Sequence, residues 1–206
     1  MRLSVENLAC ERGERRIFEG VSFTLELGDA LTVLGRNGAG KSSLLEIIAG
    51  RLAPAAGRLL LGDAGERSLP ECLHYVGHRD ALKAALTAGE NLVFARDFLG
   101  DPALPPAEAL AAIGLAHALD LPVAYLSAGQ RRRVALARLL VSERPLWLLD
   151  EPSAALDSAS QEILRRLIEA HRETGGIVIA TTHAPLFLAD AQDLTIERPP
   201  VAGAIA

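Results

Sequence analysis

The stretch from Gly35 to Ser42, GRNGAGKS, constrains this chain more than any other. It fits the pattern G-x-x-x-x-G-K-[ST] of a phosphate-binding loop, in which glycines let successive backbone N–H groups turn toward an anion. The apolar segment Ala30–Leu34 before it predicts a buried strand, and Lys41–Gly50 predicts a helix that stops at its glycine. This order directs the helix dipole at the phosphates. A chance glycine turn is the alternative, and both flanking segments argue against it.

The side chains of this loop predict how a nucleotide is held. Lys41 brings a positive charge to the β- and γ-phosphates, and the hydroxyl of Ser42 is placed to ligate Mg²⁺. The residues expected to bind the nucleotide here are Gly35, Arg36, Asn37, Gly38, Ala39, Gly40, Lys41, Ser42 and Ser43.

Composition and charge limit the class of protein. The chain has 206 residues, of which 50% are hydrophobic and 23% charged, so one folded domain with a sizeable core is expected. A net charge of −5 gives no reason to expect nucleic acid as a partner. The sequence has no signal peptide pattern and no apolar run of about 18 residues, which favours a cytosolic protein. Cys10 and Cys72 are expected to be reduced thiols.

The remaining pattern predicts a mixed α/β chain with an insertion. Leu3–Leu8 and Val21–Leu27 alternate like antiparallel strands around a charged turn, and short strands are expected at 57–62 and 73–77. From Ala81 to Leu121 the chain is rich in alanine and leucine at helical spacing. We therefore predict one domain, 1–206, with a helical subdomain inserted at about 80–142.

A pair of acids follows a second buried strand. Leu146–Leu149 is uniformly apolar and ends at Asp150 and Glu151, so a parallel strand would deliver both carboxylates to the edge where α/β proteins bind ligands. Asp150 fits a ligand of Mg²⁺, and Glu151 fits a general base for the attacking water. The alternative is that both acids only cap the turn at Pro152.

A second anion site is expected where a helix begins after Leu126. Ser127 suits the N-cap of a helix over Arg131–Ser142, whose run Arg131-Arg132-Arg133 is interpreted as a solvated face. One nucleotide does not need two phosphate sites from one chain. A dimer in which each chain lends its second site to its partner would explain the pair.

The C-terminal part predicts one further polar contact. Ser158–Thr174 has the pattern of an amphipathic helix, and Ile177–Thr181 of a buried strand that is followed by His183. His183 is expected to donate to a γ-phosphate, although a strand-end histidine can also be structural. The other histidines that stand singly are interpreted as surface residues. They are His74, His117 and His171.

Together these residues resemble the ATP-binding-cassette family along essentially the whole chain. Gly35–Ser42 resembles Walker A, and Leu146–Glu151 resembles Walker B with its catalytic glutamate. Ala154–Asp157, AALD, resembles the D-loop, and His183 the switch histidine. The family's signature LSGGQ is matched by LSAGQ, in which Ser127, Ala128, Gly129 and Gln130 are the expected nucleotide contacts. The resemblance implies ATP and Mg²⁺ as bound groups and a head-to-tail homodimer with ATP between Walker A and the partner's signature.

Two positions depart from the family pattern. Arg12 stands where an aromatic residue usually stacks on adenine, and a guanidinium can also stack on a base. His78 stands where a glutamine usually senses Mg²⁺ and the γ-phosphate and links to the membrane subunit. We expect His78 to keep this place at the catalytic and metal site.

Local strings narrow the resemblance to the haem-exporter ATP-binding subunits of cytochrome c biogenesis. These strings are LACER from Leu8, YVGH from Tyr75 and PVAYLSAGQ from Pro122. They imply a peripheral ATPase on the cytoplasmic face of a bacterial inner membrane, with integral membrane haem-exporter subunits as partners and the periplasmic haem chaperone as an indirect one. The alternatives are a transporter ATPase for another cargo and a soluble ATPase of metal-cluster assembly.

Overall fold

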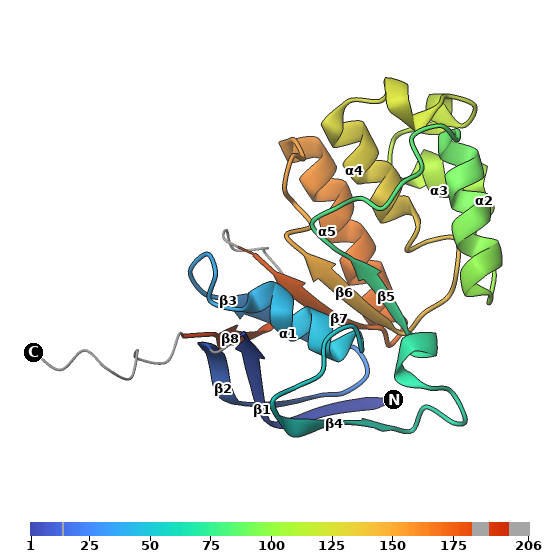
Figure 1. Cartoon of the computed structure of the whole chain (residues 1–206). Helices are drawn as coiled ribbons and strands as arrows, with labels where there is room; N and C mark the ends of the chain where they lie inside the picture. The colour runs from blue at the N-terminus through green and yellow to red at the C-terminus, as the bar shows by residue number, and fades with distance from the viewer. Residues whose placement is uncertain (14, 183–189, 198–206) are drawn as a thin grey trace, which may run out of the picture.

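Two β-sheets and five α-helices make up the part of the chain that the computed structural model describes, residues 1–13, 15–182 and 190–197 (Figure 1). None of the helices in these ranges is long and apolar enough to cross a membrane. The elements are β1 Arg2–Arg12, β2 Arg15–Leu25, β3 Ala30–Leu34, α1 Lys41–Ile48, β4 Ala56–Gly62, β5 Leu73–Val76, α2 Ala88–Leu99, α3 Pro106–Ala112, α4 Ala128–Ala137, β6 Leu146–Asp150, α5 Ser158–Glu173, β7 Ile177–Thr181 and β8 Gln192–Thr195.

The larger sheet is parallel throughout, with the strand order β5-β6-β7-β3-β8. Leu146 and Leu148 of β6 pack in the same cluster as α1, whereas Trp147 and Leu149 pack with α5. Burial of both faces accounts for the uninterrupted apolar runs in the sequence. The carboxyl ends of β3, β5, β6 and β7 consequently meet at one edge of the sheet, where the candidate site lies.

The smaller sheet is antiparallel, with the order β2-β1-β4, and α1 lies between it and the parallel sheet (Figure 1). It confirms the strands predicted near the N-terminus. Strands β1 and β2 extend further into the charged stretch than alternation indicated, because Glu11 and Arg16 face each other as an ion pair of 2.8 Å. Opposite charges at facing positions stabilise such a hairpin.

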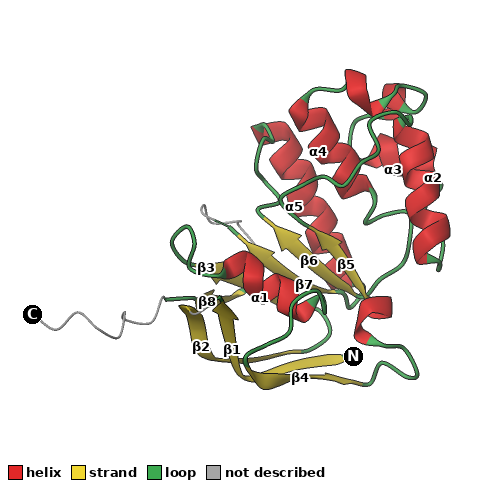
Figure 2. Ribbon diagram, in the orientation of Figure 1, coloured by secondary structure: helices red, strands yellow, loops and turns green. Residues whose placement is uncertain are grey.

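Helices α2, α3 and α4 form a lobe beside the parallel sheet with a hydrophobic cluster of its own (Figure 2). Leu92, Leu110 and Val134, one from each helix, are fully buried in it. The predicted α/β class with an antiparallel β part and a helical part is thus confirmed. The boundaries of the insertion at about 80 and 142 stay a prediction.

Helix α4 corrects the predicted helix over Arg131–Ser142, because it starts earlier and ends earlier, at Ala137. Its N-cap is Ser127, as predicted. Its end is set by residues 140–143, which pair with residues 101–104, for example where the N–H of Leu104 donates to the carbonyl of Leu140. This long-range pairing overrides the local helical pattern.

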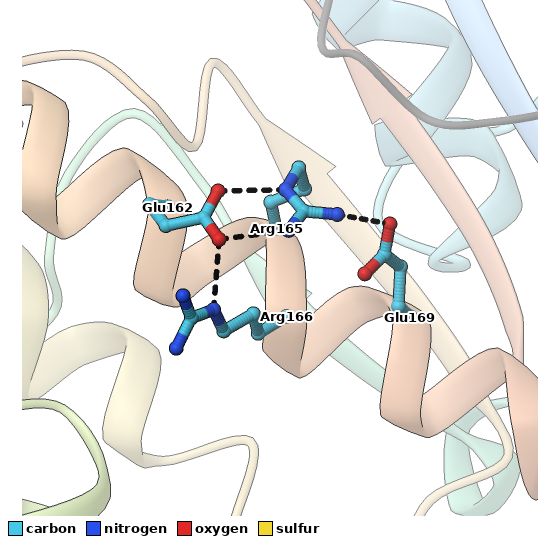
Figure 3. A network of polar contacts seen from close by, with 4 residues as sticks. All are labelled: Glu162, Arg165, Arg166 and Glu169. Carbon is cyan, nitrogen blue, oxygen red and sulfur yellow. Dashed lines mark hydrogen bonds and ion pairs between the residues drawn. The ribbon is translucent and has the colours of Figure 1, made fainter.

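Helix α5 is amphipathic, as its sequence predicts. Its buried residues are Ser160, Leu164 and Ile168. On the outer face, Figure 3 shows Arg165 between Glu162 and Glu169, with Arg166 also paired to Glu162. The two arginines lower the pKa of Glu162 to about 2. The charges satisfy one another on an exposed surface, so this network stabilises the helix only slightly.

Strand β8 was not predicted from the sequence. It lies parallel to β3 at the edge of the sheet, and its side chains are mostly exposed. The N–H of Ile196, just beyond it, donates to the carbonyl of Leu34 over 2.9 Å. An edge strand with a solvated side lacks the apolar signal that identifies the interior strands.

Of the three histidines interpreted as surface residues, only His117 is exposed, whereas His74 is buried and His171 is half-buried. His74 on β5 is buried, with Nε2 2.8 Å from the carbonyl oxygen of Ser142. His171 on α5 stacks on Trp147, with ring centroids 3.9 Å apart. Burial lowers the pKa of both histidines to about 4, because the charged form would lose its hydration.

Protonation of the unfolded chain should therefore destabilise the protein in mild acid. Between pH 6.5 and pH 4 the unfolded state takes up a proton at His74 and the native state does not, so stability falls as pH falls. From pH 7 to pH 5 this histidine alone should cost about 2 kcal/mol of unfolding free energy. In urea unfolding, the free energy of unfolding should therefore fall between pH 7 and pH 5 by about 2 kcal/mol less in His74→Gln than in wild type.

The exposed His117→Gln provides the matched control, and its unfolding free energy should follow wild type at both pH values. An equal loss for His74→Gln and wild type would show that His74 does not carry the acid sensitivity.

Candidate nucleotide-binding site

The loop between β3 and α1 adopts a backbone that requires glycine. Gly35, Gly38 and Gly40 have φ values of 146°, 76° and 109°. A Cβ on Gly40 would lie 2.5 Å from Cγ2 of Ile17, and one on Gly35 would lie 2.6 Å from the carbonyl oxygen of Ile196. The sequence pattern thus has a steric cause, because side chains at these positions would displace the loop from its supports.

A cavity of about 540 Å³ opens in front of this loop, within the size range of small-molecule sites. It brings the loop together with His78 and Glu151, which follow β5 and β6. The described residues that line it are Ile17, Arg36, Asn37, Gly38, Gly40, Lys41, Ser42, Ser43, His78, Glu151 and Ala154. An adjoining cavity of about 630 Å³ is lined by Gly35, Arg36, Asn37, Gly38, Ala39, Thr195, Ile196 and Glu197.

Lys41 is held at the base of the cavity. Its Nζ donates to the carbonyl of Gly35 over 2.8 Å and lies 3.9 Å from Oε1 of Glu151. The side chain is only 7% exposed. The cation is therefore positioned at the start of α1, where a phosphate would also meet the helix N-terminus.

Asp150 ends β6 as a buried carboxylate with hydroxyl donors. Oδ1 accepts from Ser42 Oγ over 3.1 Å and from Thr181 Oγ1 over 2.7 Å. Thr181 stands opposite Asp150 in the β6–β7 register and also accepts from the N–H of Glu151 over 3.0 Å. Register of the parallel sheet thus joins residues that are far apart in sequence.

The oxygens of Ser42 and Asp150 fit the hard ligands that Mg²⁺ prefers. Within the residues that the structure describes, no group of three or more His, Cys, Asp or Glu side chains could hold a metal ion by itself. A metal at this place would thus need further oxygens from phosphate and water, which is how Mg²⁺ is usually bound beside nucleotides.

Glu151 has the geometry expected of a constrained functional residue. Its φ is +48°, in the left-handed region that β-carbon sterics disfavour, and its side chain is 22% exposed beside the cavity. Such backbone persists only where neighbouring contacts fix it, and it is common at active sites. A carboxylate here can accept a proton from a water held in the cavity.

The LSAGQ segment lies apart from this cavity in the same chain. Ser127 and Ala128 are exposed at the start of α4, and Gln130 and Ser127 form a capping box. Gly129 is close to the loop after β6, since a Cβ there would lie 3.0 Å from the carbonyl oxygen of Ala155. The second anion site predicted from the sequence is therefore not joined to the first one within one chain.

Two other predicted residues have separate outcomes. Arg12 lies outside the cavity lining and forms an ion pair with Glu46 of α1, so its proposed stacking on adenine stays a prediction. His183 is outside the residues that the structure describes.

Sequence reasoning missed two residues that hold the acidic strand end. Thr181 reads as one more buried strand residue, and only the register with Asp150 reveals its role. Arg132 was expected on a solvated face, but it is only 4% exposed and donates to backbone carbonyls next to the cavity. The buried residues of α4 are distributed around the whole helix, so no local pattern distinguishes Arg132 from Arg131 and Arg133.

Comparisons with known proteins agree with this geometry. The family model for ABC transporters matches residues 18–154. The chain is 54% identical to the cytochrome c biogenesis ATP-binding export protein CcmA of Rhodopseudomonas palustris strain BisB5, over 92% of this chain and 95% of that protein. The protein of the same name from Bradyrhizobium diazoefficiens is 53% identical over 95% of this chain and 98% of its own length.

Solved structures share the fold. A putative ABC transporter ATP-binding protein from Pyrococcus furiosus superposes with a TM-score of 0.83 at 22% identity, covering 95% of this chain and 98% of that one. A bacterial Atm1-family ABC exporter with ATP bound gives 0.80 at 25% identity, covering 95% of this chain and 37% of that one.

Removing the Thr181 hydroxyl should slow turnover more than it weakens nucleotide binding. Thr181→Val removes one donor from the Asp150 carboxylate and the acceptor of the Glu151 N–H. Loss of such bonds should lower kcat for ATP hydrolysis by about tenfold and change KM by less than about threefold.

Thr181→Ser keeps the hydroxyl and should restore turnover, while Thr174→Val at the exposed end of α5 serves as the control. A wild-type kcat in Thr181→Val would show that the hydroxyl of Thr181 does not support turnover.

Proposed function

The chain belongs to the ABC transporter family, and from this premise we propose that it is the ATP-hydrolysing subunit of a transporter complex in cytochrome c biogenesis. The complex would export haem or release the haem-loaded periplasmic chaperone. Binding of ATP and its hydrolysis coupled to transport follow from the family itself. The observation that carries the assignment to cytochrome c biogenesis is the 54% identity to the Rhodopseudomonas protein of that name, over nearly the full length of both chains.

The geometry supports a division of labour among the residues of the site. The loop from Gly35 to Ser43 and the cation of Lys41 hold the phosphates, and Lys41 neutralises charge on them. Glu151 orients the attacking water and takes its proton. His78 lines the same cavity and is assigned to contact the γ-phosphate region. His183, beyond the described residues, keeps its proposed role as a donor there.

Mg²⁺ is proposed as the metal, with Ser42 and Asp150 as its protein ligands. The two oxygens lie 3.1 Å apart at the start of α1, which suits a shared ligand set. The ion supplies charge neutralisation at the phosphates. His78 is the third residue assigned to the metal site, because it lines the same cavity from the loop after β5.

A head-to-tail homodimer is proposed to complete the site. In one chain the exposed Ser127 at the start of α4 does not line the cavity of the phosphate loop. Pairing with a second copy would bring Ser127, Ala128, Gly129 and Gln130 of the partner to the nucleotide. The helix start would then contribute its dipole and N–H groups to the phosphates.

Integral membrane subunits are the remaining proposed partners. A transporter ATPase needs such subunits to pass its conformational change to a cargo, and the relatives are described as export proteins. We assign the chain to the cytoplasmic face of a bacterial inner membrane as a peripheral subunit, with the periplasmic haem chaperone as an indirect partner. Nucleic acid has no place in this proposal, in line with the net charge of −5.

The homodimer can be tested with a chain that binds ATP without hydrolysing it. Glu151→Gln should elute as a dimer on size exclusion in ATP and Mg²⁺ and as a monomer without nucleotide. Ser127→Arg in the same background should abolish the dimer, because the long side chain would occupy the proposed interface. A Glu151→Gln chain that stays monomeric at saturating ATP would argue against it.

The haem assignment can be tested in cells that lack this protein. Wild type should restore mature c-type cytochrome on haem-stained gels, whereas Glu151→Gln should leave it nearly absent and let haem accumulate on the periplasmic chaperone. The reason is that the glutamine cannot accept the proton of the attacking water. Glu173→Gln, at the exposed end of α5, is the matched control and should restore cytochrome.

Normal cytochrome in the cells without the protein would remove the haem assignment and favour another cargo. The assignment to the ABC family would be unaffected by that result, since it rests on the match of the sequence.

A further inference from the structure

One arginine of α4 is buried although its neighbours are not. Arg132 is 4% exposed, whereas Arg131 and Arg133 on either side are half-buried. A guanidinium is never deprotonated in proteins, so a buried one must have its N–H donors satisfied. The partners of Arg132 therefore indicate what the residue does.

One arm of the guanidinium holds the loop that follows β5. Nη1 donates to the carbonyl of Gly77 over 2.8 Å and to Oδ1 of Asp80 over 3.3 Å. These two residues flank His78, which lines the cavity in front of the phosphate loop. The loop is thereby fixed at two points on either side of His78.

The other arm holds the end of β6. Nη2 donates to the carbonyls of Asp150 and Glu151, each over 2.9 Å, and Nε lies 3.3 Å from the carbonyl of Pro152. Five hydrogen bonds thus use the five N–H donors of one side chain. Three of them go to the consecutive carbonyls of residues 150–152, around Glu151, which is proposed as the base.

The segment that these three hydrogen bonds hold, residues 150–152, contains a residue with strained backbone. Glu151 has φ +48°, which a residue with a β-carbon adopts only under constraint. Arg132 fixes the carbonyl on each side of this residue, while Thr181 accepts from its N–H. The carbonyl of Glu151 also accepts from the N–H of Ala154 over 3.1 Å, so loss of the guanidinium would leave the turn with this bond and the one to Thr181 but without its connection to α4.

We propose that Arg132 is a positioning residue, which locks Glu151 and the His78 loop into one rigid unit with the helix that carries the LSAGQ segment. Its planar fork is essential, since only separated donors can hold Gly77 and Asp150 at once. A displacement of the loop after β5 then moves Glu151, because both segments are hydrogen-bonded to the same guanidinium. The proposal rests on ATP hydrolysis at the described cavity.

The substitution that isolates the fork is Arg132→Lys. It keeps the positive charge and the aliphatic stem but offers a single nitrogen instead of three. Arg144→Lys is the matched control, because Arg144 is equally buried at 6% exposure and contacts Leu99 and Asp101 within the helical lobe. Both variants would be made in the full chain, and folding would be checked by the emission of the single tryptophan, Trp147.

Amide hydrogen exchange gives a readout that does not depend on turnover. In Arg132→Lys, peptides covering residues 77–80 and 149–153 should both exchange at least tenfold faster, while the rest of β6 stays protected. Arg144→Lys should leave both segments at wild-type rates. Unchanged exchange in folded Arg132→Lys would overturn the proposal, and so would acceleration in only one of the two segments.

Turnover separates positioning from mere support of the fold. With kcat counted per titrated ATP-binding site, Arg132→Lys should lose at least twentyfold in kcat while KM for ATP changes by less than threefold. A kcat within twofold of wild type would overturn the proposal and leave the assignment as an ATPase intact. Wild type itself without turnover would instead contradict the proposed function, and the exchange measurement would still decide the role of Arg132.

If Arg132→Lys fails to fold, Asp80→Ala decides the matter, because Asp80 is partly exposed and its loss spares the interior. This variant removes one of the two contacts that tie the loop to the guanidinium. It should speed exchange in 77–80 and lower kcat per site by at least threefold. Wild-type values for both would overturn the proposal.

Discussion

Burial of the parallel sheet on both faces is the constraint on which the rest of this structure depends. With α1 on one side and α5 on the other, the interior strands must be apolar until they end. Polar side chains with chemical work to do are then confined to the edge where the strands stop. Register determines which of them meet, and it brings Asp150 beside Thr181 and within reach of Ser42. The position of a residue along its strand therefore determines where its side chain lies in the site.

Backbone carbonyls, as well as side chains, hold the charged residues of the site in place. Gly35 offers its carbonyl to Lys41, and the carbonyls of Gly77 and Asp150 are held by Arg132. Each of these two buried cations therefore joins loop segments that lie just beyond the ends of the strands. Because unpaired buried charges are costly, these contacts cannot be exchanged for weaker ones without a loss of order. The arrangement favours a site that is already organised before a nucleotide arrives.

The sequence predicted those features that depend on local pattern or on contiguous motifs. The phosphate loop, the strand that ends at Asp150 and the N-cap at Ser127 follow from a few adjacent residues each. Features that depend on distant partners were missed or misjudged. The early end of α4, the edge strand β8, and the burial of His74 and Arg132 all result from tertiary contacts. A run of three arginines does not reveal which one faces inward until the end of β6 is placed against α4.

The backing of the phosphate loop by Ile196 has a consequence for how the chain is made. Gly35 leaves the ribosome long before the strand that supports it, and β8 must pair with β3 before the carbonyl of Ile196 reaches the loop. Contacts of such long sequence separation form late in folding. The nascent chain therefore exposes a glycine-rich segment that is still free to change shape. Its pocket can take its final form only after residue 196 has emerged from the ribosome and β8 has paired with β3.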